Sequence, residues 1–254
     1  MYPTLFQIGS FKLASFGVMM VIAFVASLWL ATKRAPKFGI DSKGLSDVAF
    51  WAIIAGILGA RLFFIVQDLP YYLKHREELF SAQFQGLTSF GGFIVGGFVA
   101  AYICKKKGIP VMGFLDLVTP AFLLGHAIGR IGCLLNGCCH GRPAEHAFPF
   151  AVYSSEIEKY CVPAQIYDSL MNVGALFLLL WLEKRFPRHG YTLGMGLVLH
   201  GLTRFIYEFF RAGSSSTTIG SLPITDGHIM ALVIMVAGAF FVVRSKARPI
   251  EVLA

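Results

Sequence analysis

Charged residues are scarce in this sequence of 254 residues. They make up 14% of the chain, whereas 56% is hydrophobic, and an average soluble domain is about one quarter charged. The mean hydropathy is +0.67. This composition excludes an ordinary soluble domain and predicts an integral membrane protein, because the chain holds several of the roughly 20-residue apolar runs that span a bilayer.

Other features are missing as well. The N-terminus lacks the basic start and small-residue cleavage site of a secretory signal, so its first apolar run is expected to be a retained helix. The five cysteines are odd in number and show no CxxC spacing, which fits neither a secreted disulfide framework nor a common zinc motif. No internal repeat and no inverted pair of broken helices is detectable, which disfavours a transporter.

The apolar runs predict an all-α, polytopic membrane protein with about seven transmembrane helices in a single domain over residues 1–254. An outer-face loop region over about residues 130–164 would interrupt the helices. The predicted spans are residues 13–32, 47–66, 89–104, 112–129, 165–183, 192–210 and 227–243.

Basic residues gather between alternate spans. The four basic segments are residues 33–43, 105–108, 183–190 and 244–249. The net charge of +8 could indicate nucleic-acid binding, but clustering at helix ends argues against that partner. By the positive-inside rule these segments are cytoplasmic, which predicts an N-terminus outside and a C-terminus in the cytoplasm.

Four glycines stand at helical spacing within residues 91–97, in the run GGFIVGG. Small residues at this spacing let two helix backbones approach closely. We therefore expect tight helix packing there.

Two arginines lie where an apolar helix is expected. An arginine at the bilayer centre costs at least roughly 2.5 kcal/mol, so it faces a partner, a water-filled cavity or an anionic ligand. Arg204 lies between His200 and Glu208 at intervals of four residues, and a self-contained Arg204–Glu208 ion pair is one explanation. That pair would not explain Arg130, which follows His126 by one turn. Two guanidiniums favour a clamp for a lipid phosphate.

A second polar face begins the span over residues 165–183. Gln165, Asp168 and Asn172 share one helical face just after Pro163, which is typical of a helix start. This face is either a helix end that meets water and head groups or part of a site. In the second case Asp168 would hold an arginine in place.

Cysteines and a histidine follow Arg130 in the stretch GRIGCLLNGCCHGRP. Cys133, Cys138, Cys139 and His140 could supply four zinc ligands, but vicinal cysteines fit one tetrahedral ion poorly. Loop packing of small residues explains them better, so no metal and no cofactor is expected. His126 and His140 are ordinary hydrogen-bonded histidines or, beside a bound phosphate, candidate proton acceptors.

Taken in order, GRIGCLLNGCCHGRP, VPAQIYDSLMN and HGLTRFIYEFFR, with GLTSFGGFIVGG and SFGVMM upstream, resemble the prolipoprotein diacylglyceryl transferase family along essentially the whole chain. The resemblance implies a multi-pass enzyme of the bacterial inner membrane with its active site toward the outer leaflet. It would transfer diacylglycerol from phosphatidylglycerol to the lipobox cysteine of a preprolipoprotein signal peptide and release glycerol phosphate. The bilayer would be its third partner.

The resemblance also implies site residues. Matching positions are Arg130, Asn136, Gly141, Arg142, Gln165, Tyr167, Arg204 and Glu208. Asp168 and Arg61, a further arginine in an apolar segment, complete the expected substrate-binding set. The expected catalytic residues are Arg130, Arg204, His200, His126 and His140.

Several positions depart from the family pattern. Phe90 stands where many members have a catalytic histidine, and Phe16 replaces an aromatic hydroxyl. Cys133 replaces an asparagine, Cys138 a carboxylate, and His200 a tyrosine.

These departures leave alternatives open. His200, His126 or His140 replaces the missing base, or the acceptor or donor has changed on the same scaffold. A non-catalytic phospholipid-binding membrane protein is the alternative from another class, and a transporter is a third. The two retained arginines favour the first.

Overall fold

The computed structural model describes residues 2–8, 11–75, 89–144, 151–154, 157–212, 216–219 and 222–247. The chain forms two compact units. The first comprises residues 1–34 and 115–254, and the second comprises residues 35–114. A single domain over residues 1–254 stays a prediction, and each unit is described by itself.

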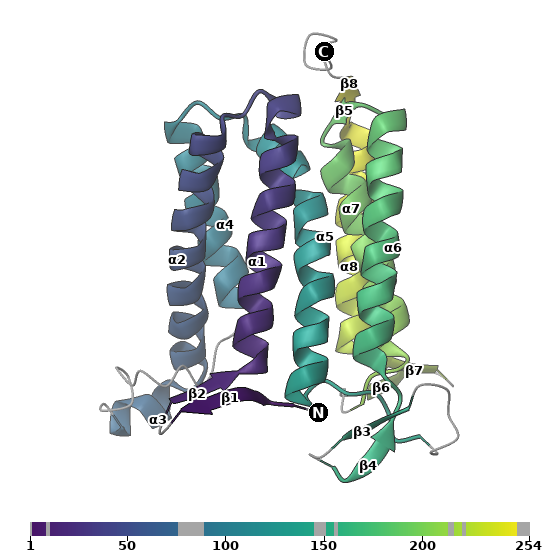
Figure 1. Cartoon of the computed structure of the whole chain (residues 1–254). Helices are drawn as coiled ribbons and strands as arrows, with labels where there is room; N and C mark the ends of the chain where they lie inside the picture. Colours follow the sequence, from purple (N-terminus) through teal and green to yellow (C-terminus); the bar gives the residue numbers. More distant parts are fainter. Residues whose placement is uncertain are drawn as a thin grey trace. The chain divides into compact units, whose positions relative to one another are not determined.

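Five long helices build the first unit (Figure 1). They are α1 (Ser15–Arg34), α5 (Val111–Asn136, which starts in the second unit), α6 (Ala164–Arg185), α7 (Tyr191–Glu208) and α8 (Asp226–Arg244). Local signals set their ends. Thr225 and His228 form a reciprocal capping box at the start of α8, and Pro163 precedes α6, as the sequence predicts.

Short antiparallel strand pairs lie at both ends of these helices (Figure 1). At one end, β1 (Thr4–Ile8) pairs with β2 (Phe11–Ala14), β3 (Val152–Ser154) with β4 (Lys159–Cys161), and β6 (Ser216–Ile219) with β7 (Leu222–Thr225). At the other end, β5 (Arg188–His189) pairs with β8 (Lys246–Ala247). The strand pairs therefore connect helix ends and leave the helices as the body of the unit.

A buried ionic cluster joins the helix ends near β5. Arg34 at the end of α1 forms a two-pronged ion pair with Glu183 of α6, with N–O distances of 2.8 and 3.1 Å. The carboxylate of Asp116 in α5 accepts hydrogen bonds from the backbone N–H groups of Gly190 and Leu193, both at 2.8 Å. A carboxylate satisfies the unpaired N–H groups at a helix start, so Asp116 fixes the start of α7.

The second unit holds η1 (Ala35–Phe38), α2 (Ser42–Gln67), α3 (Leu69–Lys74) and α4 (Ser89–Lys106). Helices α2 and α4 pack through glycines. A β-carbon on Gly91 would overlap the Gly59 carbonyl and the Phe63 side chain, and one on Gly96 would lie 2.9 Å from the Ala52 carbonyl. The close packing expected of the run at 91–97 is confirmed, except at Gly97, where a β-carbon would meet nothing within 4 Å.

Helices of the described chain overlap the seven predicted spans, with ends that differ at residues 13–14 and 209–210. Five helical stretches of the described chain have the length and apolarity to cross a membrane, and the number seven stays a prediction. These five are residues 15–38, 42–67, 111–136, 164–185 and 226–244. Large apolar side chains point outward from them, such as Phe177 and Trp181 on α6 and Val236 on α8. A mostly helical membrane protein is therefore confirmed.

The predicted boundaries shift in one place that matters. Helix α5 continues to Asn136 rather than ending near residue 129, so Arg130, Cys133 and Asn136 lie on a helix and not in the loop region expected over 130–164. Two predictions fall outside the description: the side chain of Phe90, and the end of the basic segment at residues 248–249.

Candidate active site

Three helices of the first unit bring polar side chains together. His126 and Arg130 lie one turn apart on α5, Asp168 and Asn172 one turn apart on α6, and His200 faces them from α7. The hydroxyl of Ser169 donates to the Ala127 carbonyl at 2.9 Å and holds α6 against α5. The one-turn spacing on each helix is visible in the sequence, whereas the meeting of the three helices is not.

The carboxylate of Asp168 is the centre of this cluster. Its Oδ2 lies 2.5 Å from the Arg130 Nε and 3.2 Å from the His126 Nε2. Its Oδ1 accepts a hydrogen bond from the Asn172 side chain at 2.7 Å. Asp168 is 1% exposed, so its charge depends on these partners. The polar face of α6 is therefore buried, so it is not a helix end that meets water and head groups. Asp168 pairs with an arginine, Arg130, as the alternative predicts.

His200 extends the cluster. Its Nδ1 lies 3.2 Å from the Asn172 Oδ1, which places the proton on Nδ1. Its ring packs edge-on against the rings of His126 and Phe122, with centroids 4.9 and 5.1 Å away. His200 is therefore held in place by neighbours on α5 and α6.

Tyr207 lies beside both arginines. The guanidinium carbon of Arg130 is 4.6 Å from the centre of its ring, and that of Arg204 is 5.0 Å away. The two guanidiniums are therefore separated by no more than the sum of those distances. Sequence reasoning did not single out Tyr207, although its position three residues after Arg204 puts it on the same helical face.

The ion pair expected within α7 is present. The Arg204 Nη2 lies 2.8 Å from the Glu208 Oε2, and the Arg211 Nη1 lies 3.9 Å from the Oε1. Glu208 is buried, and its carboxylate packs against Gly227, where any β-carbon would overlap it. Arg204 keeps 22% of its side chain exposed, so the ion pair does not bury it fully.

The loop after α5 is fixed by backbone contacts. The Gly141 N–H donates to the Val162 carbonyl at 3.0 Å, and the Arg142 N–H donates to the Phe210 carbonyl at 2.9 Å. A β-carbon on Gly141 would overlap both of those carbonyls, so only glycine fits. Arg142 is exposed, and the His140 Nδ1 lies 3.1 Å from the Gly141 carbonyl oxygen.

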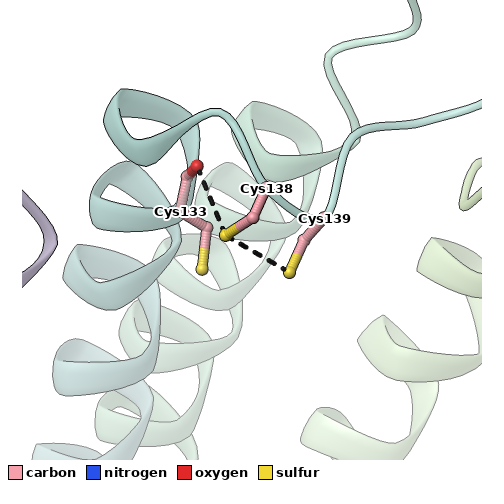
Figure 2. Close-up of side chains that lie close together, drawn as sticks. All are labelled: Cys133, Cys138 and Cys139. Carbon is pink, nitrogen blue, oxygen red and sulfur yellow. Dashed lines mark hydrogen bonds between the residues drawn. The ribbon is translucent and has the colours of Figure 1, made fainter. Parts of the chain in front are cut away.

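Three thiols gather where α5 ends (Figure 2). The sulfur atoms of Cys133, Cys138 and Cys139 all lie within 4.8 Å of one another. Hydrogen bonds from the thiols of Cys133 and Cys139, and from the Asn136 side chain, lower the pKa of Cys138 below that of an ordinary thiol. The Gln165 Nε2 donates to the Cys138 carbonyl at 2.8 Å and anchors the turn to α6. The role expected of these cysteines, loop packing, stays a prediction.

An apolar groove of about 470 Å³ lies between α6 and α7. Its lining residues are Tyr167, Leu170, Met171, Ile206 and Phe210. Tyr167 directly precedes Asp168, and Ile206 directly precedes Tyr207. The groove is therefore built by two of the helices that carry the polar cluster.

Two predicted positions remain, Arg61 and Phe16. Arg61 belongs to the second unit, where its guanidinium carbon is 5.6 Å from the centre of the Tyr72 ring. Phe16 on α1 packs against α5 at Gly132 and brings no hydroxyl there.

Buried, partnered charges inside apolar helices define a helical membrane protein with a polar site, and two of the same helices also form an apolar groove. A sequence profile described as prolipoprotein diacylglyceryl transferase matches residues 3–244. A phosphatidylglycerol–prolipoprotein diacylglyceryl transferase of Clostridium tetani is 33% identical over 83% of this chain and 86% of its own length. One of Methylobacillus flagellatus is 32% identical over 97% of both chains.

The chain belongs to the prolipoprotein diacylglyceryl transferase family, and it is an enzyme. This membership favours a transferase over the non-catalytic lipid-binding protein and over the transporter. The relatives are bacterial, which agrees with a chain whose helices can cross a membrane.

Proposed function

We propose that this enzyme transfers the diacylglyceryl group of phosphatidylglycerol to a cysteine thiol of a prolipoprotein signal peptide. The names of its relatives give the two substrate classes. In this reaction the thiol sulfur bonds to a glyceryl carbon, the bond from that carbon to a phosphate oxygen breaks, and glycerol phosphate leaves. The site must accept the thiol proton and stabilise the charge that the phosphate gains.

Arg130 and Arg204 hold the phosphate in this proposal. The observation that carries it is the position of both guanidiniums against the single ring of Tyr207, at 4.6 and 5.0 Å. Each already pairs with a buried carboxylate, Asp168 or Glu208, which fixes its orientation. A guanidinium has five N–H donors, so donors remain for phosphate oxygens after each carboxylate is satisfied.

His126 is the base in this proposal. The His126 Nε2 lies 3.2 Å from the Asp168 Oδ2 and 3.4 Å from the Arg130 Nε. In the tautomer whose Nε2–H donates to Asp168, Nδ1 is the basic nitrogen, and the carboxylate pairs with the imidazolium that forms. His200 orients the His126 ring through their edge-on contact. His140 lies in the loop beyond α5, where its Nδ1 is close to the carbonyl of the next residue.

The groove between α6 and α7 takes an acyl chain of the donor lipid. Its lining is apolar apart from the Tyr167 hydroxyl. Helices α6 and α7, which line it, also carry Asp168 and Arg204. A lipid whose phosphate is held by the arginines would therefore extend its hydrocarbon chains along the helices that form this groove. Burial of apolar surface in the groove would add affinity without orienting the reacting atoms.

Seven membrane spans with the site toward the outer leaflet of the inner membrane complete the proposal. The basic ends of α1, α6 and α8 support it, because the Arg34–Glu183 ion pair and the β5–β8 pairing join these ends. The polar cluster lies at the opposite ends of α5, α6 and α7. By the positive-inside rule, the basic end is cytoplasmic.

Complementation of a conditional strain that lacks its own diacylglyceryl transferase tests the activity, with lipidation read as a gel shift. We expect rescue by the native chain and none by Arg204→Gln. Arg188→Gln is the matched control, since Arg188 is an exposed arginine on β5 at the far end of the unit. If Arg204→Gln rescues the strain as well as the native chain does, Arg204 does not hold the phosphate.

Purified enzyme with an acceptor peptide tests the base. His126→Ala should lower kcat by about 10²- to 10⁴-fold, whereas His140→Ala should keep kcat within a few-fold of the native value. Release of glycerol phosphate, measured directly, separates turnover from lipid binding. A native kcat in His126→Ala would exclude His126 as the base.

A further inference from the structure

The three thiols at the end of α5 have no role in the proposed transfer reaction. Cys133 lies on the last turn of α5, and Cys138 and Cys139 follow directly after the helix. Their sulfur atoms lie within 4.8 Å of one another, and those of Cys138 and Cys139 are 3.7 Å apart (Figure 2). All three are free thiols. The cluster therefore presents three soft donor atoms around one point.

The backbone conformation of the turn makes this arrangement possible. Gly137 has φ 85° and Cys139 has φ 60°. The left-handed region is uncommon for a residue with a β-carbon, yet it turns the Cys139 thiol toward that of Cys138. The objection that vicinal cysteines cannot share an ion does not apply to this conformation.

Contacts from two other helices hold the turn. The Gln165 side chain donates to the Cys138 carbonyl at 2.8 Å, and the Tyr207 hydroxyl donates to the Cys139 carbonyl at 3.4 Å. The thiols are therefore positioned by α6 and α7 as well as by their own turn. Because the thiols are already held in place, they need little rearrangement to bind a metal ion.

The spacing and the donor type match a thiolate-bound metal ion. Thiolates coordinate zinc at about 2.3 Å, which separates neighbouring sulfurs by roughly 4 Å. Thiolates prefer Cu(I) and Zn(II) among common metals. In the described part of the chain no histidine, aspartate or glutamate joins the three sulfurs as a fourth ligand. Structural zinc sites have four protein ligands, and zinc with three protein ligands keeps a water in the fourth position. A set of three thiolates without an oxygen or nitrogen ligand suits the softer Cu(I) better.

We propose that Cys133, Cys138 and Cys139 form a trithiolate site for one Cu(I) ion beside Arg130. Binding forms three Cu–S bonds and releases the protons of the thiols. The resulting negative charge lies about one helical turn from Arg130, because Cys133 follows Arg130 by three residues on α5. This inference does not rest on the proposed function.

Titration of the reduced, full-length enzyme with Cu(I) under anaerobic conditions tests the site, with a chromogenic Cu(I) chelator as competitor. We expect one Cu(I) per chain and a sulfur-only coordination shell in X-ray absorption. Replacing Cys133, Cys138 or Cys139 by serine should weaken binding at least 10-fold, and replacing all three should abolish it. Cys104→Ser and Cys161→Ser are matched controls, because those cysteines lie outside the cluster.

Three outcomes would overturn the proposal. Unchanged Cu(I) affinity in the triple serine variant would place the ion elsewhere. Tighter binding of Zn(II) than of Cu(I) would refute the choice of metal. Absence of copper from native protein whose five thiols all titrate as reduced would refute the site itself, and thermal unfolding of each variant checks that a loss of binding is not a loss of fold.

Discussion

Removing the cation at position 130 leaves a buried carboxylate without its charge partner. Asp168 is 1% exposed and lies 2.5 Å from the Arg130 Nε. Breaking one side of a buried ion pair costs about 3–5 kcal/mol. His126 and Asn172 remain as hydrogen-bond partners, so Arg130→Gln should cost about 3 kcal/mol. For a chain of this size that lowers Tm by roughly 6–12 °C.

A double variant separates this structural cost from the role in catalysis. Asp168→Asn added to Arg130→Gln removes the orphaned charge, so stability should return to within about 1 kcal/mol of the native enzyme. Activity should stay low by at least about 10²- to 10³-fold, because no guanidinium faces the leaving phosphate from this position and His126 loses the Asp168 carboxylate. Asp168→Asn alone measures the second loss.

Thermal unfolding in detergent and peptide lipidation on the same samples give the two readouts. If Arg130→Gln melts at the native temperature, the reasoning from the buried pair is wrong. If the double variant regains activity, Arg130 serves only to neutralise Asp168. The proposal that Arg130 holds the phosphate is then wrong.

Three further predictions concern other parts of the chain. Gly91→Ala should destabilise the α2–α4 packing by about 1–3 kcal/mol, whereas Gly97→Ala, with open space at its β-carbon, should not; equal Tm values would contradict this. Gly141→Ala should abolish lipidation by displacing the backbone of Val162, measured as gel shift beside a folding control. Iodoacetamide should label Cys138 of the metal-free enzyme at lower pH than Cys161, because neighbouring thiols lower the pKa of Cys138 and burial raises that of Cys161; mass spectrometry of a pH series with the reverse order would refute it.

The sequence by itself determined the helical membrane architecture, since long apolar runs and basic breaks act locally. It also located Arg130, Arg204 and Asp168 as site candidates. A charged side chain within an apolar helix is costly, so it must face a partner, a water-filled cavity or a ligand. The close packing of the run at 91–97 was predictable for the same reason: small residues at helical spacing are a local signal.

Only the tertiary structure decided which of these side chains meet. Helix periodicity gives the faces of single helices and no distances between them. The contact of Asp168 with both Arg130 and His126 therefore had to come from the packing of α5 against α6. Tyr207 lies against both arginines because α7 packs beside α5. The three thiols converge because a left-handed turn is held by contacts from α6 and α7, and neither the turn nor these contacts can be deduced from the spacing of the cysteines.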